Sequence, residues 1–85
     1  MVYEVFVHEK ARRKFGKLKD AVLKERLREL FKLLSEPFNL DTVKIKGRES
    51  VYRTRIGKYR VLEKIEGGTV YVTDFDHRGK IYKKL

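Results

Sequence analysis

The sequence predicts an α+β domain in which an N-terminal strand is followed by two antiparallel helices packed on a three- to four-stranded antiparallel sheet. Three observations support this fold class. Residues 2–7 alternate like a strand, and residues 9–35 carry apolar side chains at helical spacing. Residues 51–75 contain three strand-like runs separated by glycine turns. At 85 residues, the chain has the size of a single domain covering residues 1–85.

Two helices are expected after the first strand, Val2–Val7. The first spans Glu9–Lys19, and Asp20 is placed to cap a second helix that runs to about Ser35, just before Pro37. The apolar stripe of the second helix suits packing on a sheet, with a coiled-coil partner as the alternative. The residues expected to face inward are Ala11, Phe15, Leu18, Leu23, Leu27, Leu30, Phe31 and Leu34.

The second half of the chain is expected to form the sheet. Val43–Lys46 is a short extended piece. The meander that follows consists of Val51–Ile56, Tyr59–Ile65 and Thr69–Phe75, with turns at Gly57 and at Gly67-Gly68. Its strand pattern closes on residues 77–82.

The chain is strongly basic, with 22 Lys and Arg against 12 Asp and Glu and a formal net charge of +10. This balance favours a polyanionic partner, nucleic acid first and an acidic protein second. The alternative is a self-repelling surface without a dedicated partner. Gln is absent and Asn39 is the only Asn, a bias typical of thermophilic proteins.

Several classes of protein find no support in the sequence. No cysteine is present and His8 and His77 lie far apart, so neither disulfides nor a zinc site are expected. Asp74, Asp76 and His77 are close together, but adjacent acids in turns usually form caps, and no metal or other cofactor is expected. No apolar run approaches the roughly 20 residues of a membrane span, and no signal peptide precedes the first strand. A cytoplasmic protein without membrane contact is expected.

Cations recur at strand spacing in the predicted meander. Arg53 and Arg55 share one face of their strand, and the short turn makes Arg60 of the next strand their neighbour. If they share the open face of the sheet, they form a cationic surface for phosphates, which Lys44 and Lys46 would extend. The alternative is the solvated face of a sheet that helices cover on its other side.

RNA carries its own nucleophile, the 2′-hydroxyl, so a ribonuclease needs only to orient it, stabilise the phosphate charge and protonate the leaving oxygen. Arginine suits the charge-stabilising task because it binds phosphate in a bidentate manner. Tyr82 is a candidate to stack on a base or exchange a proton. His77 is a candidate acid or base, or else a turn histidine that hydrogen-bonds the backbone.

Four segments, in this order and spacing, resemble the RelE/ParE toxin superfamily, and the chain is close to its RelE branch. They are Lys44-Ile45-Lys46-Gly47, Val51-Tyr52-Arg53-Thr54-Arg55, Gly57-Lys58-Tyr59-Arg60-Val61-Leu62 and His77-Arg78-Gly79-Lys80-Ile81-Tyr82. The resemblance implies a toxin of a type II toxin–antitoxin system. It further implies a ribosome-dependent endoribonuclease that cleaves mRNA in the A site and thereby inhibits translation.

The resemblance also assigns roles. Arg60 matches the arginine that holds the scissile phosphate, Arg78 the late arginine at the leaving group, and Tyr82 the tyrosine that stacks on the substrate base. Arg53 and Arg55 match a pair of cations that are lysines in bacterial RelE. The expected catalytic set is Arg60, Arg78, Tyr82 and Arg53, and the expected RNA- and ribosome-binding set is Arg55, Lys44, Lys46, Lys58 and His77.

Two departures from the family pattern matter. Arginine is a poor general base, so Arg53 points to another base or to charge stabilisation alone. Too few residues follow Tyr82 for the C-terminal helix of some members, so regulation through such a helix is not expected.

Partners and alternatives also follow from the resemblance. The expected partner is an antitoxin that wraps the toxin with an amphipathic helix and acidic residues. The free toxin is expected to be monomeric and the complex heterotetrameric. The alternative function is a non-enzymatic, ParE-like toxin that binds DNA gyrase, or an inactive relative that only binds RNA.

Overall fold

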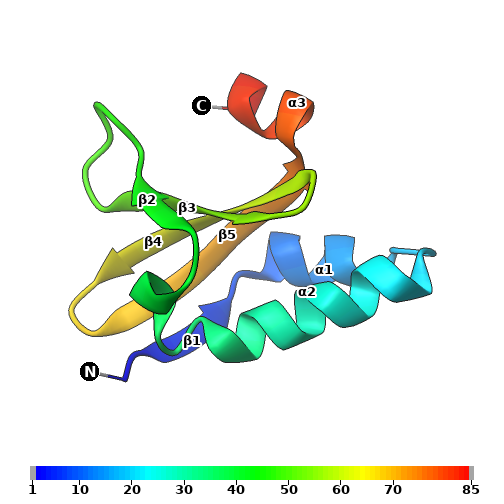
Figure 1. The fold of residues 1–85 in the computed structure, drawn as a ribbon, viewed down its shortest axis with the longest axis horizontal. Coiled ribbons are helices and arrows are strands. Elements are labelled where there is room, and N and C mark those ends of the chain that lie inside the picture. The colour runs from blue at the N-terminus through cyan, green and yellow to red at the C-terminus, as the bar shows by residue number, and fades with distance from the viewer. Residues whose placement is uncertain (1, 85) are drawn as a thin grey trace.

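The computed structural model describes residues 2–84 as one sheet with two helices on one face and a short helix on the other (Figure 1). The elements in chain order are β1 (Glu4–Val7), α1 (Glu9–Gly16), α2 (Ala21–Leu33), the 3-10 turn η1 (Pro37–Asn39), β2 (Thr42–Lys44), β3 (Val51–Ile56), β4 (Tyr59–Glu66), β5 (Thr69–His77), α3 (Arg78–Ile81) and the 3-10 turn η2 (Tyr82–Lys84). The predicted fold class is confirmed. None of the helices in the described part of the chain is long and apolar enough to cross a membrane.

The sheet has five strands in the order β1-β5-β4-β3-β2, so the expected number of three to four was too low. β1 joins the edge of the sheet by pairing parallel to β5, whereas β2, β3, β4 and β5 pair antiparallel. The extra strand follows from connectivity. A strand that is separated from its partner by helices and further strands can lie parallel to it, which no short turn permits.

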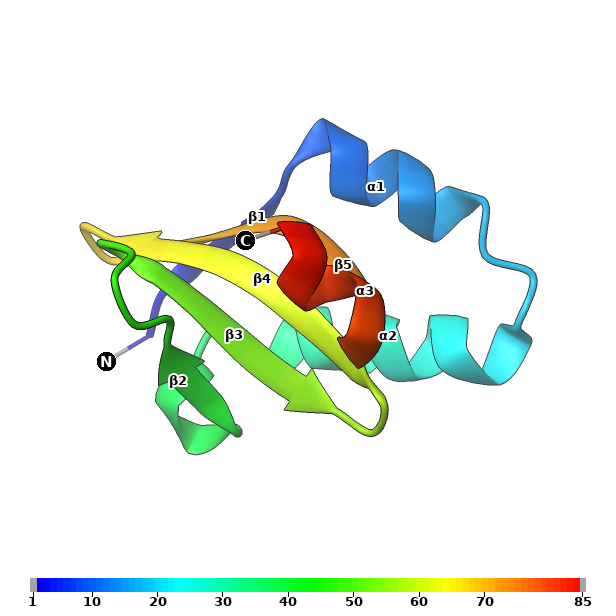
Figure 2. The ribbon, with the colours of Figure 1, turned by 90° about the horizontal axis from the view of Figure 1, so that it is seen from above.

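Helices α1 and α2 run antiparallel below the sheet, as Figures 1 and 2 show. His8 caps α1 by accepting a hydrogen bond from the Lys10 N–H (3.2 Å). Asp20 caps α2 by accepting one from the Leu23 N–H (3.0 Å), as its sequence position predicts. The rings of Phe15 and Phe31 lie 5.8 Å apart between the two helices. The main core lies between the helices and the sheet, and its buried members are Ala11, Leu23, Leu27, Leu30, Leu34, Val61, Ile65, Val70, Val72 and Phe75.

A β-bulge in β5 decides which of its side chains reach the core. Leu62 pairs with Asp74 but Glu63 pairs with Val72, which leaves Thr73 as the extra residue. Val72 and Phe75 are both buried in the core, although they do not follow strict alternation. The bulge therefore turns Asp74 to the opposite face of the sheet, beside Leu62.

The last residues depart from the predicted strand ending. Residues 78–81 form a helical turn, α3, which lies across the sheet on the side away from α1 and α2 (Figures 1 and 2). The expectation that the strand pattern closes on residues 77–82 is therefore wrong beyond His77. His77 caps α3 by accepting a hydrogen bond from the Gly79 N–H (3.4 Å), and the Arg78 N–H bonds to the Lys58 carbonyl (2.8 Å). These two bonds turn the chain out of the sheet.

Candidate functional site: a cationic sheet face

The sheet face that α1 and α2 leave uncovered, called here the open face, carries three arginines at its centre. Arg55 pairs with Arg60 across β3 and β4, and Arg53 pairs with Leu62 on the same face. We call Arg53, Arg55 and Arg60 the arginine row. The register confirms that the three arginines converge on one face, as their spacing predicts. Like charges directly opposite each other are destabilising, so this arrangement favours an anion between them.

Acidic side chains flank the arginine row on both sides. The Arg55 N–H donates to the Asp41 carbonyl (2.9 Å), which places Asp41 beside Arg55 at the β2 edge. On the other side Arg60 pairs with Asp76 of β5. Asp76 and Asp74 both bind the ammonium group of Lys14 on α1, at 2.8 and 3.2 Å. The charges across the sheet thus run acid, arginine, arginine, acid.

Arg60 is the most enclosed member of the row, with only 7% of the residue exposed. Its Nη1 donates to the carbonyl oxygens of Gly57 (3.0 Å) and Tyr59 (2.9 Å) in the β3–β4 turn. Gly57 adopts φ 57°, which favours glycine and places its carbonyl within reach of Arg60. The buried Nε of Arg60 has no hydrogen-bond partner among the described residues. An unsatisfied buried donor costs roughly 1–3 kcal/mol, and such costs are concentrated at functional sites.

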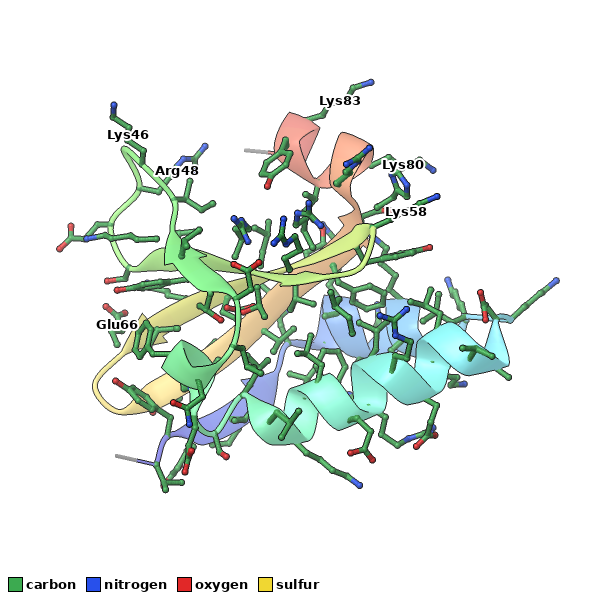
Figure 3. All side chains as sticks on the ribbon, in the orientation of Figure 1. Lys46, Arg48, Lys58, Glu66, Lys80 and Lys83 are labelled. Carbon is green, nitrogen blue, oxygen red and sulfur yellow. The ribbon has the colours of Figure 1, made fainter. Side chains whose placement is uncertain are left out.

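The remaining residues proposed for catalysis come from the segment above the open face. Arg78 begins α3 and is exposed, and Tyr82 follows α3 with 48% of the residue exposed. Figure 3 shows Lys80 and Lys83 of this segment on the same side of the sheet as Lys46 and Arg48 from the β2–β3 loop. The two segments form a basic rim around the open face.

The structure corrects the predicted position of Lys44. Lys44 pairs with Tyr52, so its side chain shares the helix-covered side of the sheet, and Val43 instead lies beside Arg53. Lys46 lies beyond the end of β2, in the loop at the rim (Figure 3). Lys58 is exposed in the β3–β4 turn, and His77 serves as the cap of α3, which is the backbone-bonding role.

Sequence reasoning missed Asp41, which contacts two members of the arginine row. Its Oδ2 lies 2.6 Å from Arg55 Nε and its Oδ1 lies 3.4 Å from Arg53 Nη1. The contact depends on the register of β2 and β3, because pairing Val43 with Arg53 in an antiparallel ladder places residue 41 opposite residue 55.

Solved structures of similar fold include toxins in complex with their antitoxins. The archaeal RelE–RelB complex from Pyrococcus horikoshii OT3 contains a chain 26% identical to this one, with a TM-score of 0.75 over 94% of this chain and 99% of that chain. The RelBE2 complex from Mycobacterium tuberculosis contains a chain with 31% identity and a TM-score of 0.72, over 92% and 100%. A mutant of the Escherichia coli toxin RelE in the free state shares the fold at 18% identity, with a TM-score of 0.75 over 99% and 93%. The comparison with curated proteins gave no match.

The fold and the arginine row define a RelE-like α+β domain with a cationic sheet face. A family model described as "ParE toxin of type II toxin-antitoxin system, parDE" matches residues 5–82. The chain therefore belongs to the ParE toxin family, within the RelE/ParE superfamily of type II toxin–antitoxin systems. This confirms the resemblance that the four sequence segments carry.

Proposed function

We propose that this toxin is a ribosome-dependent endoribonuclease that cleaves mRNA in the A site by attack of a 2′-hydroxyl on the adjacent phosphate. The observation that carries the proposal is the arginine row, with Arg60 enclosed at its centre. Arg78 and Tyr82 come from the segment that lies above the same face. The proposal is supported by three arginines on one face of the sheet, and by a further arginine and a tyrosine in the segment above that face.

The proposed division of labour follows from the chemistry of each group. Arg60 holds the scissile phosphate, because a guanidinium fixed by two carbonyl oxygens is already oriented before substrate arrives. Arg78 stabilises the charge that develops at the leaving oxygen, and Tyr82 stacks on a base. Arg53 and Arg55 bind neighbouring phosphates. Because RNA supplies the nucleophile, the chief task of the protein is to position the 2′-hydroxyl and to stabilise the charge on the phosphate.

We infer that the protein partner is an acidic antitoxin. The matched structures from P. horikoshii and M. tuberculosis are complexes of toxin with antitoxin. The net charge of +10 and the basic rim favour a partner whose carboxylates cover the open face. The proposed complex is a heterotetramer, formed in the cytoplasm where ribosomes and mRNA are present.

Primer extension on mRNA in programmed ribosomes tests the proposed cleavage. Wild-type toxin is expected to create new 5′ ends within the A-site codon, and only when ribosomes are present. Arg60→Ala is expected to lower the cleavage rate by about 10²-fold or more, as for loss of a group that stabilises transition-state charge. Arg78→Ala, at an exposed residue, is expected to lower the rate without changing the melting temperature.

Arg12→Ala is the matched control, because Arg12 is an exposed arginine of α1, away from the open face. Thermal unfolding of each variant separates a loss of catalysis from a loss of fold. If Arg60→Ala cleaved mRNA at the wild-type rate, Arg60 would not belong to the catalytic site.

Inhibition of DNA gyrase is the second candidate function, since the matching family model describes ParE toxins. The same preparations therefore go into a supercoiling assay. Intact mRNA together with inhibited supercoiling would show that the protein is a gyrase poison and not a ribonuclease. Intact mRNA with unaffected supercoiling would instead indicate a relative that only binds.

A further inference from the structure

Asp41 supplies a carboxylate that bridges two arginines of the arginine row. Its two oxygens are divided between them, with Oδ2 at 2.6 Å from Arg55 Nε and Oδ1 at 3.4 Å from Arg53 Nη1. Asp41 lies directly before β2 and is held there by the hydrogen bond from the Arg55 N–H to its carbonyl oxygen (2.9 Å). The sheet therefore fixes the backbone of Asp41 at the edge of the open face.

A carboxylate that binds two guanidinium groups stands in for a phosphate. Both anions present two oxygens to arginine, and arginine binds both through the same planar N–H groups. Arg53 and Arg55 are the two residues to which the proposed function assigns phosphates that neighbour the cleaved one. Asp41 thus engages N–H groups of Arg53 and Arg55 that would otherwise be available to an RNA phosphate.

The exposure of Asp41 and Arg55 indicates that the ion pair between them is weak. The Asp41 side chain is 39% exposed and that of Arg55 is 56% exposed, whereas the Arg53 side chain is 19% exposed. Ion pairs between exposed side chains contribute little and are screened by salt. A polyanion that brings several phosphates at once can therefore displace a single carboxylate.

We propose that Asp41 is an internal anion that occupies the phosphate-binding position of Arg53 and Arg55 until RNA displaces it. This proposal rests on the proposed function and concerns the regulation of the same site. In the free toxin Asp41 relieves the repulsion between Arg55 and the facing Arg60. The bound carboxylate also weakens the affinity for RNA in general.

Weakened general affinity makes cleavage selective for mRNA on the ribosome. Binding elsewhere on the ribosome raises the effective concentration of mRNA beside the open face, so the second binding event becomes intramolecular. Free RNA does not gain this raised effective concentration, so it competes with Asp41 only at its concentration in solution. Asp41 is therefore a specificity-determining residue, not a catalytic one.

Binding of a 2′-O-methyl oligoribonucleotide tests the proposal, because this RNA lacks the nucleophile and cannot be cleaved. Fluorescence anisotropy would compare wild-type toxin with Asp41→Asn over a range of salt concentrations. Asn keeps the shape and the backbone carbonyl of residue 41 but removes the charge. The variant is expected to bind about two- to fivefold more tightly at low salt, the range that a weak surface pair can contribute. Its salt slope should steepen by about 0.7 for each additional phosphate that the protein neutralises.

Glu29→Gln is the control with the same change in net charge. Glu29 is an exposed carboxylate of α2, 3.7 Å from Lys32, on the helix side of the sheet. Asp41→Asn in a protein that also carries Arg53→Gln and Arg55→Gln should show no increase in affinity, because the two binding groups are gone.

The outcomes separate this proposal from the proposed function. Equal binding by Asp41→Asn and Glu29→Gln, or weaker binding by Asp41→Asn, would overturn the role of Asp41. If wild-type toxin still cleaves mRNA on ribosomes in that case, the ribonuclease assignment stands alone. If wild-type toxin neither binds the oligonucleotide nor cleaves, both proposals fail. Tighter binding that is confined to Asp41→Asn and abolished by the two arginine changes supports the internal anion, whether or not cleavage is observed.

Discussion

At the scale of single residues, Glu63 is the least expected member of the fold, because it is a fully buried carboxyl group on the helix side of the sheet. Its Oε1 accepts a hydrogen bond from Thr54 Oγ1 (2.8 Å), whose own partner across to β2 is Thr42 Oγ1 (2.6 Å). Its Oε2 has no partner among the described residues. Burial raises the pKa of Glu63 to about 8, although the hydrogen bond from Thr54 and the charge of Arg53 both act to lower it.

The raised pKa of Glu63 predicts that stability falls as pH rises. The folded protein keeps the proton of Glu63 up to about pH 8, whereas the unfolded chain releases it near the ordinary value of 4.5. In that window the unfolded state binds fewer protons, so the free energy of unfolding decreases by roughly 1.4 kcal/mol per pH unit from this group. Glu63→Gln should remove this slope.

Urea unfolding of both proteins between about pH 5 and about pH 8 measures the difference. The two proteins should differ most at the upper end, where Glu63→Gln is the more stable. Parallel pH profiles would mean that Glu63 ionises in the folded state as it does in the unfolded chain.

At the scale of secondary-structure elements, α3 depends on contacts with the rest of the fold. A helix of four residues has no stability of its own, because nucleation costs more than so few hydrogen bonds return. Ile81 is fully buried yet does not belong to the main core, and Leu62 is the buried apolar residue of β4 on the same face. α3 also contacts β5. We infer that the buried Ile81 anchors α3, which begins with Arg78 and is followed by Tyr82, on the open face of the sheet.

Ile81→Ala is expected to lower the free energy of unfolding by about 2–5 kcal/mol, the usual cost of truncating a buried isoleucine. Cleavage should fall more steeply than stability alone explains, because Arg78 and Tyr82 lose their fixed positions. Ile81→Val, which removes one methylene, should cost about 0.5–1.5 kcal/mol and retain most activity. Denaturation and primer extension on the same samples check both effects. An unchanged midpoint for Ile81→Ala would show that α3 is not held through this side chain.

At the scale of the whole molecule, sequence reasoning succeeds where structure is decided locally. The cap at Asp20, the apolar stripe of α2, the bounds of β3 and the turn at Gly57 were all predicted, because each depends on residues near in sequence. The parallel pairing of β1 with β5 was missed, because it joins residues 4–7 to residues 69–72 and leaves no turn signal.

The candidate site was likewise predicted where it depends on residues that are near in sequence, and missed where it does not. Arg53, Arg55 and Arg60 converge because one short hairpin aligns them. Lys44 was placed on the wrong face, because the pairing of β2 with β3 is set across a longer loop, and a shift of one residue reverses every side chain. The helix α3 was not predicted, because the cap at His77 and the hydrogen bond from Arg78 to Lys58 form only once the β3–β4 turn is folded.

The excess of positive charge predicts that the free toxin becomes more stable as salt is added. A net charge of +10 on 10.2 kDa opposes the compact state, and added ions screen that repulsion. An increase of about 1 kcal/mol in the free energy of unfolding would raise the melting temperature by about 4–8 °C in a domain of this size. Calorimetry in increasing sodium chloride measures the trend. A melting temperature that falls with salt would show that ion pairs outweigh the repulsion.

The pairing of β1 with β5 also bears on how the chain is made. Synthesis releases β1 first, but its partner residues, 69–72, follow after four-fifths of the sequence. Until they emerge, β1, which forms one edge of the sheet, has no partner strand. Contacts between residues so distant in sequence form late and slowly. The order of synthesis therefore predicts that the β3–β4 hairpin with its arginine row can form before β1 takes its place at the edge of the sheet.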